Sequence, residues 1–536
     1  MYKKLFSAGT KAMLAGSFCT GILMSCHKDN GATPSGGNGG DTAQVTAAMK
    51  EDSLKYLMYQ IMQVTYGDGG RTAKSGLPTY YWYDKVPQLN PLSSQFGTAD
   101  ALLTQMKTYA INPATQQPYD HYSFLDRDGT ITNKLMNGVS ARNFAAVTGD
   151  VGMEIAPVLA ATNSSNVRWF VLYADKNSPA GKAGIQRGWE ITSVNGTTNF
   201  TNTQASLNFV SNAVLQSSSV ALGLTQADGT TKSTITLNTA SYNINPVLFD
   251  SVYTVKNSDQ NTVKVGYFVF YTFSSVYNDQ GQPTFTKTIL DQTLSKFAGQ
   301  GIKNLIVDLR YNGGGATTTA EYLDSAIAPS KAAGKVMYNY LYNDKITQNL
   351  AATGLTSQVL FPSSTGGMQL DNVFFIVSGN TASASELTLN NLKPYMNVRL
   401  IGDTTYGKPV GFIDFNISMY SNGKPSIYLA DLYAINFETK NANNQGGYFT
   451  GIPQDPGAFA NDYVNVPWGN TTADQNLQQA FNFIMKGQYL GLNPSARMSA
   501  VNNDNLRMPI PGVKTLQNNF NGMVDYRLSK EVSRLR

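Results

Sequence analysis

The sequence predicts an α/β protein with a helical N-terminal region, a small β domain and a larger layered domain. Three observations support this fold class. From about residue 260 to 490, short apolar runs alternate with stretches of helical periodicity, which is typical of helices packed on a largely parallel sheet. Residues 146–243 contain short strands separated by polar turns. Residues 45–145 carry a helical pattern instead.

The start of the chain predicts export and a membrane anchor. Residues 1–26 have a basic beginning and a short apolar run, MLAGSFCTGILMSC, which is typical of a secretory signal and too short to span a bilayer. The ending Leu-Met-Ser-Cys resembles a bacterial lipobox, which implies lipidation of Cys26; an ordinary signal peptide is the alternative. Residues 27–44 are then a flexible tether. We expect a lipid-anchored protein of the bacterial cell envelope, on the outer membrane and facing the periplasm or the surface.

Composition excludes several classes of site. The net charge is only +5 over 536 residues, and no basic cluster with interleaved aromatics occurs, so we expect no nucleic-acid partner. Both cysteines, Cys19 and Cys26, lie in the predicted signal, and the histidines are His27 and His121. A thiol nucleophile, a disulfide and a zinc site built on thiolates or several histidines are therefore excluded from the folded part. No metal or organic cofactor is expected.

Residues 45–145 are predicted to form a helical N-terminal domain. Leu54, Leu57, Met58 and Ile61 repeat at the spacing of one helix face.

Residues 146–243 are predicted to form a peptide-binding domain. The run WFVLYADKNSPAGKAGIQRGWEITSVNGTT predicts a strand, a small-residue helix that begins at Ser-Pro-Ala, a second strand and an Asn-Gly turn. This run resembles a bacterial PDZ domain. The resemblance implies that VGMEIAP is the peptide-binding loop and strand, with Gly152, Met153, Glu154 and Ile155 receiving a chain end by strand addition. A generic small β domain is the alternative.

Residues 244–488 are predicted to form the layered domain. Its strands are KVGYFVFYTF, NLIVDLR, VFFIVS and VRLIG, and helices follow at 285–297, AEYLDSAIA and SASELTLNNLK. Thr472 and Gln475 have the spacing of a capping box, opening a helix with Leu477, Ala480, Phe481 and Ile484 on one side. Residues 489–536 are a polar C-terminal extension, either disordered or a small appendage.

The stretch GNTASASE, directly after the strand VFFIVS, places serines at the start of a helix. A serine there is a possible nucleophile, because unpaired N–H groups of the first helical turn can stabilise an oxyanion. The alternative is that Ser383 and Ser385 only cap the helix.

Two further glycine-rich stretches supply the remaining parts of such a site. Lys408 lies in TTYGKPVG, after a strand that we expect beside the first. If desolvated, this lysine can lose its proton near neutral pH and act as a general base, whereas a surface lysine cannot. In DLRYNGGG, residues 308–315, three glycines follow a buried strand and let the backbone approach a ligand closely. A plain turn is the alternative.

DLRYNGGG, GNTASASE and TTYGKP, in this order after a PDZ-like region, resemble the C-terminal processing (tail-specific) serine peptidases, in a Bacteroidota-type lipoprotein form. The resemblance implies a crotonase/ClpP-like catalytic domain with Ser383 as nucleophile and Lys408, 25 residues later, as base. It also implies an oxyanion hole from the backbone N–H groups of Gly314 and Ala384, with Glu386 orienting the site.

The sequence departs from the family at two positions. Many members have a glutamine four residues after the lysine, where this chain has Phe412. Some branches place a histidine beside the serine, but His121, in DHYSFLD, stands one position early for this role. We therefore expect a Ser383–Lys408 dyad, with His121 as a structural or rim residue.

These observations predict a serine endopeptidase that cleaves unfolded protein substrates or C-terminal peptides captured by the PDZ domain. Two alternatives are a catalytically inactive peptide-binding pseudo-peptidase and an esterase on a crotonase-like fold.

Overall fold

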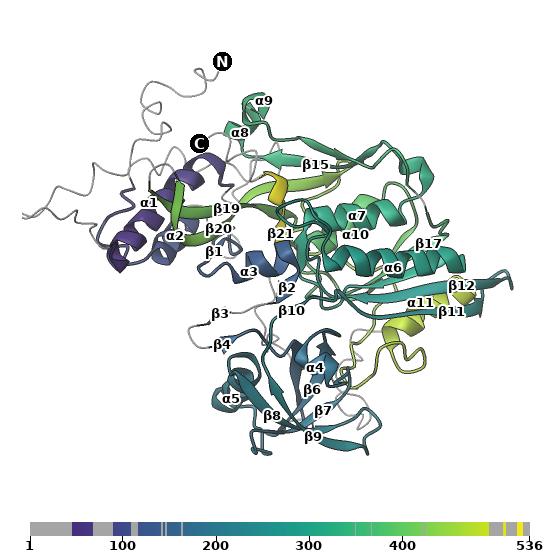
Figure 1. Ribbon diagram of the computed structural model, residues 1–536. Coiled ribbons are helices and arrows are strands. Elements are labelled where there is room, and N and C mark those ends of the chain that lie inside the picture. Colours follow the sequence, from purple (N-terminus) through teal and green to yellow (C-terminus); the bar gives the residue numbers. More distant parts are fainter. Residues whose placement is uncertain are drawn as a thin grey trace, which may run out of the picture.

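The structure is a computed structural model (Figure 1), and it describes most of the folded chain. The described residues are 45–67, 89–108, 116–140, 143–144, 147–161, 164–348, 350–365, 367–421, 424–492, 508–510 and 522–528. The predicted signal peptide, its lipidation residue Cys26 and the tether 27–44 lie outside them. Among the described residues, helices long and apolar enough to cross a bilayer are absent.

The N-terminal region contributes two helices, α1 (Ala47–Thr65) and α2 (Ala99–Lys107), whose first turns are capped by threonine side chains. On the predicted apolar face of α1, Leu54 and Met58 are buried and Leu57 and Ile61 are partly buried, and all four pack into the same core as the layered domain. Strand β1 (Phe124–Asp126) pairs with β20 (Lys424–Asn441) of the layered domain. The prediction of a separate helical domain is therefore wrong, because these elements complete the large sheet and share its core.

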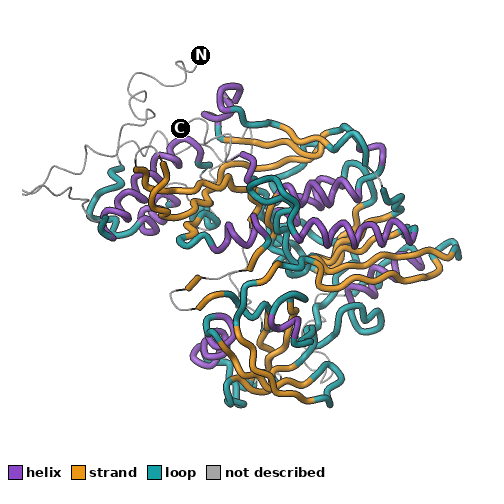
Figure 2. Tube along the Cα trace, in the orientation of Figure 1, coloured by secondary structure: helices purple, strands orange, loops and turns teal. Residues whose placement is uncertain are grey.

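A five-stranded antiparallel unit follows and has its own core around Trp169. Its strands, in spatial order, are β5 (Met153–Leu159), β6 (Val167–Ala174), β7 (Glu190–Val194), β8 (Ser219–Thr225) and β9 (Lys232–Asn238). Its helices are α4 (Pro179–Lys182), capped by Ser178 as the Ser-Pro-Ala motif predicts, and α5 (Gln204–Leu215). Figure 2 shows this strand-rich unit below the larger body.

The layered domain contains the predicted, largely parallel sheet. It runs in the order β11 (Val247–Lys256), β12 (Thr262–Phe270), β13 (Asn304–Asp308), β17 (Asn372–Val377) and β18 (Val398–Gly402), with only β11 antiparallel. Helices α6 (Phe285–Gln300), α7 (Thr317–Ile327) and α10 (Ala384–Leu392) cover one face, and α11 (Gln475–Lys486) covers the other (Figure 1). Both faces are buried, which explains the continuous apolar runs.

A second sheet was not apparent in the sequence pattern. Its order is β14 (Gly314–Ala316), β21 (Gly522–Val524), β19 (Val410–Ser421), β20, β15 (Val336–Tyr342) and β16 (Gln358–Leu360). Short helices α8 (Asp344–Gln348) and α9 (Leu350–Thr353) follow β15. Part of the predicted extension 489–536 thus forms an inner strand of this sheet.

The start of α11 differs from the prediction. Asp474 is the N-cap, and its side chain accepts the N–H of Asn476. Thr472 donates to Asn470 instead, so the predicted capping box is wrong. The predicted apolar face is buried.

Asp126→Asn should change the pH dependence of stability. Burial raises the pKa of Asp126 to about 6 from its ordinary value of 3.8, so the folded protein binds this proton more tightly than the unfolded chain does. The resulting stabilisation is complete below about pH 4 and is lost as the pH rises through about 6. Between about pH 4 and pH 7, the free energy of unfolding of the wild type should therefore fall by up to ~3 kcal/mol relative to that of the variant. Urea denaturation at each pH measures this difference; a constant difference would contradict the assignment.

Candidate active site

Ser383 lies between β17 and α10, in the N-cap position of α10. Its φ is 61° and its ψ is −108°, a left-handed conformation that is strained for a residue with a side chain. The side chain is buried, and its hydroxyl has no hydrogen-bond partner among the described residues. Ser383 and Glu386 occupy the positions of a capping box at the start of α10, and the Glu386 carboxylate accepts the Ser383 N–H. A buried hydroxyl without a good hydrogen bond is costly, so the strained backbone and the buried hydroxyl favour a functional role for this serine in addition to capping.

Glu386, one turn into α10, connects the serine to the lysine loop. Its Oε2 accepts the backbone N–H groups of Ser383 and Lys408, each at 2.8 Å. Its Oε1 accepts the Thr405 hydroxyl at 2.5 Å and the Gly407 N–H at 2.8 Å. The carboxylate is fully buried, and burial raises its pKa while the four donors oppose that shift. One side chain thus holds the backbones of both predicted catalytic residues together.

Lys408 lies in the loop between β18 and β19 and is only 1% exposed. Its ammonium nitrogen is 4.0 Å from the centre of the Phe412 ring and 4.8 Å from that of Tyr122. Burial lowers the pKa of Lys408 well below its ordinary value, although the charges of Asp120 and Glu386 raise it. An aromatic face therefore stands where many family members have a glutamine, and the environment favours the neutral amine that a general base requires.

The segment Asp120–Ser123 covers the lysine loop, and the sequence analysis missed its main contributors. The Oδ1 of Asp120 accepts the N–H groups of Tyr122 and Ser123 at 2.9 and 2.8 Å, which fixes a turn. The Tyr122 hydroxyl donates to the Gly407 carbonyl at 3.2 Å. His121 is exposed, with its ring centre 3.8 Å from that of Tyr122, which places it at the rim. The sequence does carry a signal for this turn, because an aspartate side chain often accepts the backbone N–H groups two and three residues after it.

The glycine loop lies directly against the start of α10. Asn312 accepts the Ala382 N–H at 3.1 Å and the Ser385 hydroxyl at 3.0 Å through its carbonyl oxygen. A Cβ on Gly314, whose φ is 106°, would lie 2.9 Å from the backbone nitrogen of Ala384, so this position requires glycine. The structure brings the two predicted oxyanion donors together in this way.

The N–H of Gly314 does not point to the serine, however. It donates to Oδ1 of Asn312 at 2.9 Å. The oxyanion role of Gly314 stays a prediction, and it requires this N–H to exchange Asn312 for the oxyanion as its acceptor.

The predicted peptide-binding residues Gly152, Met153, Glu154 and Ile155 lie at the start of β5, an edge strand, and all are buried. The Gly152 carbonyl accepts the Asp175 N–H at 2.9 Å. Farther along β5, the Pro157 carbonyl accepts the N–H of Ile510 at 3.1 Å. This edge is thus already in contact with another segment of the chain.

An arginine cluster, also missed in the sequence, joins the five-stranded unit to the glycine loop. Arg187 donates to the Tyr311 hydroxyl and to Asp462, each at 2.7 Å, and lies 4.2 Å from the Trp468 ring centre. Arg310 donates to Asp308, Asp462 and Asp474. Because Arg310 and Tyr311 directly precede Asn312, the two units are held together immediately beside the loop.

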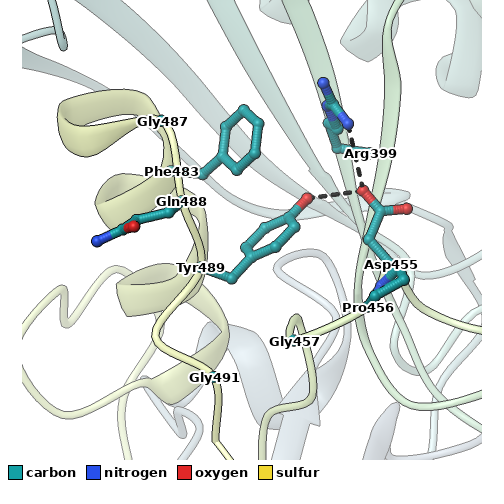
Figure 3. Close-up of a pocket in the computed structure, with 9 residues that line it drawn as sticks. All are labelled: Arg399, Asp455, Pro456, Gly457, Phe483, Gly487, Gln488, Tyr489 and Gly491. Atoms are coloured by element: carbon teal, nitrogen blue, oxygen red, sulfur yellow. Dashed lines mark hydrogen bonds and ion pairs between the residues drawn. The ribbon is translucent and has the colours of Figure 1, made fainter.

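A surface cavity of about 450 Å³ lies elsewhere, between β18 and the end of α11 (Figure 3). Arg399 lies over the Phe483 ring, and the Tyr489 hydroxyl donates to Asp455 at 2.8 Å. The predicted catalytic residues do not line this cavity.

Comparisons with known proteins agree with the motifs. Residues 264–428 match the family model of peptidase family S41. A solved structure assigned as an S41 protease from Bacteroides fragilis NCTC 9343 is 20% identical, covers 80% of this chain and 96% of that chain, and has a TM-score of 0.54. The photosystem II D1 C-terminal processing protease is 18% identical and covers 77% of this chain and 93% of that chain, with a TM-score of 0.41. No curated protein matches the sequence. The family match confirms the resemblance to C-terminal processing peptidases, and the first structure supports a shared mixed α/β fold.

Glu386→Gln should lower kcat by about a hundredfold, because an amide cannot accept all four hydrogen bonds that position the serine and the lysine. Removing the charge also lowers the pKa of Lys408, so the acid limb of the residual pH–rate profile should move to lower pH. Peptide hydrolysis across pH measures both effects. Glu190→Gln, at a carboxylate paired with Arg168, is the control; an unmoved limb in Glu386→Gln would contradict the positioning role.

Proposed function

We propose that this chain, whose residues 264–428 match peptidase family S41, is a serine endopeptidase of the C-terminal processing type. The observation that carries the proposal is the Glu386 carboxylate, which accepts the backbone N–H groups of both Ser383 and Lys408. It holds the backbones of the two buried residues together, although the Ser383 hydroxyl makes no hydrogen bond to the Lys408 amine in this structure. The proposed dyad forms when the amine turns into hydrogen-bond reach of the hydroxyl.

In the proposed reaction, neutral Lys408 takes the proton of the Ser383 hydroxyl as the oxygen attacks the scissile carbonyl. The oxyanion is stabilised by the N–H of Ala384, at the positive end of α10, and by that of Gly314 once it turns from Asn312. Lys408 then protonates the leaving amine, and water attacking the acyl-enzyme completes hydrolysis.

We also propose that the five-stranded unit is a PDZ-like domain that captures unfolded or C-terminal protein segments. Its edge strand β5 and the neighbouring Gly152 turn support this role, since strand addition uses the edge of a sheet. The signal-like start supports a lipid anchor at Cys26 and a site in the bacterial envelope.

Ser383→Ala should abolish cleavage of an unfolded, tagged protein, a loss of about a thousandfold or more. Ser385→Ala is the matched control: this buried serine, two residues away, donates to Asn312 and should leave measurable activity. Cleavage products are followed on gels, and labelling by a fluorophosphonate is followed by mass spectrometry. Persistent cleavage by Ser383→Ala would remove the assignment; binding without cleavage by the wild type would favour a pseudo-peptidase, and ester hydrolysis alone an esterase.

The pH–rate profile should reveal Lys408 as the base. Because burial lowers its pKa well below 10.5, kcat/KM should rise with pH and reach its plateau far below that value. Asp120→Asn removes a charge that raises the pKa of Lys408, so it should shift the rise to lower pH. A shift to higher pH would contradict this electrostatic assignment.

A further inference from the structure

The C-terminal strand β21 occupies an internal position beside the catalytic residues (Figure 1, yellow). It lies between β14, which carries Gly314, and β19, which begins two residues after Lys408. Met523 and Val524 are fully buried, and β21 also contacts α10, the helix that follows Ser383. A segment of the chain's own extension thus fills a one-strand gap between the two halves of the site.

The same strand holds the oxyanion loop in a non-donating orientation. The Gly522 N–H donates to the Gly313 carbonyl at 3.0 Å, and the Gly314 N–H donates to Asn312 at 2.9 Å. This carbonyl and this N–H belong to a single planar peptide unit. Turning the N–H towards Ser383 rotates the whole unit and therefore breaks the hydrogen bond to Gly522. Glycines on both sides make such a rotation sterically accessible.

A second segment of the extension lies on the predicted capture site. The Ile510 N–H donates to Pro157 of edge strand β5, and the Ile510 side chain packs in the core of the five-stranded unit. Met508 packs beside Tyr463 and Val466 of the layered domain. The extension therefore contacts both the edge that strand addition would use and the gap beside Ser383.

An ion pair and several hydrogen bonds join the β21 segment to the rest of the protein. The Arg527 guanidinium donates to Asp525 at 2.7 Å and to Glu321 of α7 at 2.6 Å. The Tyr340 hydroxyl donates to Asp525, and that of Tyr338 donates to Glu321 at 2.6 Å. The Asp525 N–H also donates to the Phe412 carbonyl at 3.0 Å.

We propose that residues 508–510 and 522–528 are an intramolecular inhibitor that occupies the path of a substrate strand. The inhibitor rests on the proposed function of Ser383 and Lys408. With β21 docked, Ser383 and Lys408 are buried and the Gly314 N–H is bound to Asn312. Undocking of β21 opens a slot in which an extended substrate pairs with β14 and β19, and it frees the peptide unit to complete the oxyanion hole.

Arg527→Ala tests the proposal without touching the catalytic residues. Losing the ion pair with Glu321 of α7 weakens docking, so fluorophosphonate labelling of Ser383 and peptide cleavage should both accelerate by about tenfold or more. Arg127→Ala is the matched control, because Arg127 also pairs with two carboxylates, Glu51 and Asp100, at a similar exposure. Unchanged or slower labelling of the folded Arg527→Ala protein would overturn the inhibitor.

A disulfide lock provides the converse test. Ala316 and Val524 are register partners on β14 and β21, and both native cysteines precede residue 27, so the double variant Ala316→Cys/Val524→Cys can be oxidised selectively once residues 1–26 are omitted. The oxidised form should label at least about tenfold more slowly than the reduced form, with the single variants as controls. Equal rates, or a faster oxidised form, would show that β21 is a permanent part of the active site.

These experiments distinguish a failure of the proposed function from a failure of the proposed inhibitor. If labelling accelerates in Arg527→Ala but occurs at a residue other than Ser383, the proposed nucleophile is wrong. If Ser383 labels equally in every form, the nucleophile stands and the inhibitor is refuted.

Discussion

The candidate site depends on the two hydrogen bonds that one oxygen of Glu386 accepts, from the backbone N–H groups of Ser383 and Lys408. Ser383 lies in the connection between β17 and α10, whereas Lys408 lies in the connection between β18 and β19. A buried carboxylate can satisfy several donors only where they converge, so it fixes the loop against α10. The second carboxylate oxygen holds Thr405 and Gly407 in the same way.

Burial sets the properties of the Lys408 amine and the Ser383 hydroxyl. Desolvation destabilises the charged form of Lys408, and the rings of Tyr122 and Phe412 cover its amine in place of water. The same enclosure leaves the Ser383 hydroxyl without a hydrogen-bond partner in the described part of the chain. Such costs are tolerated at functional sites because the surrounding fold over-determines the conformation. A site built this way requires a means of opening before a polypeptide can reach it.

The glycine loop links the two domains and the C-terminal strand to the candidate site. Its preceding residues, Arg310 and Tyr311, are held by the charge cluster that joins the five-stranded unit to the layered domain. Its following residues form β14, which pairs with β21. The peptide unit between Gly313 and Gly314 is hydrogen-bonded at both ends, to Gly522 of β21 and to Asn312, so the proposed undocking of β21 would release one of the two bonds that hold its orientation.

The sequence by itself determined the parallel sheet, the helix after Ser383 and the identity of the motif residues, because apolar periodicity and glycine placement are local signals. It could not determine that β1 pairs with β20, since such pairing depends on partners some three hundred residues apart. Only the tertiary structure decided that β21 lies between β14 and β19, and that Asn312 rather than Ser383 faces the Gly314 N–H. A three-residue strand has no periodicity to recognise, and a peptide's orientation follows from its hydrogen-bond partners, which assemble only when the chain folds.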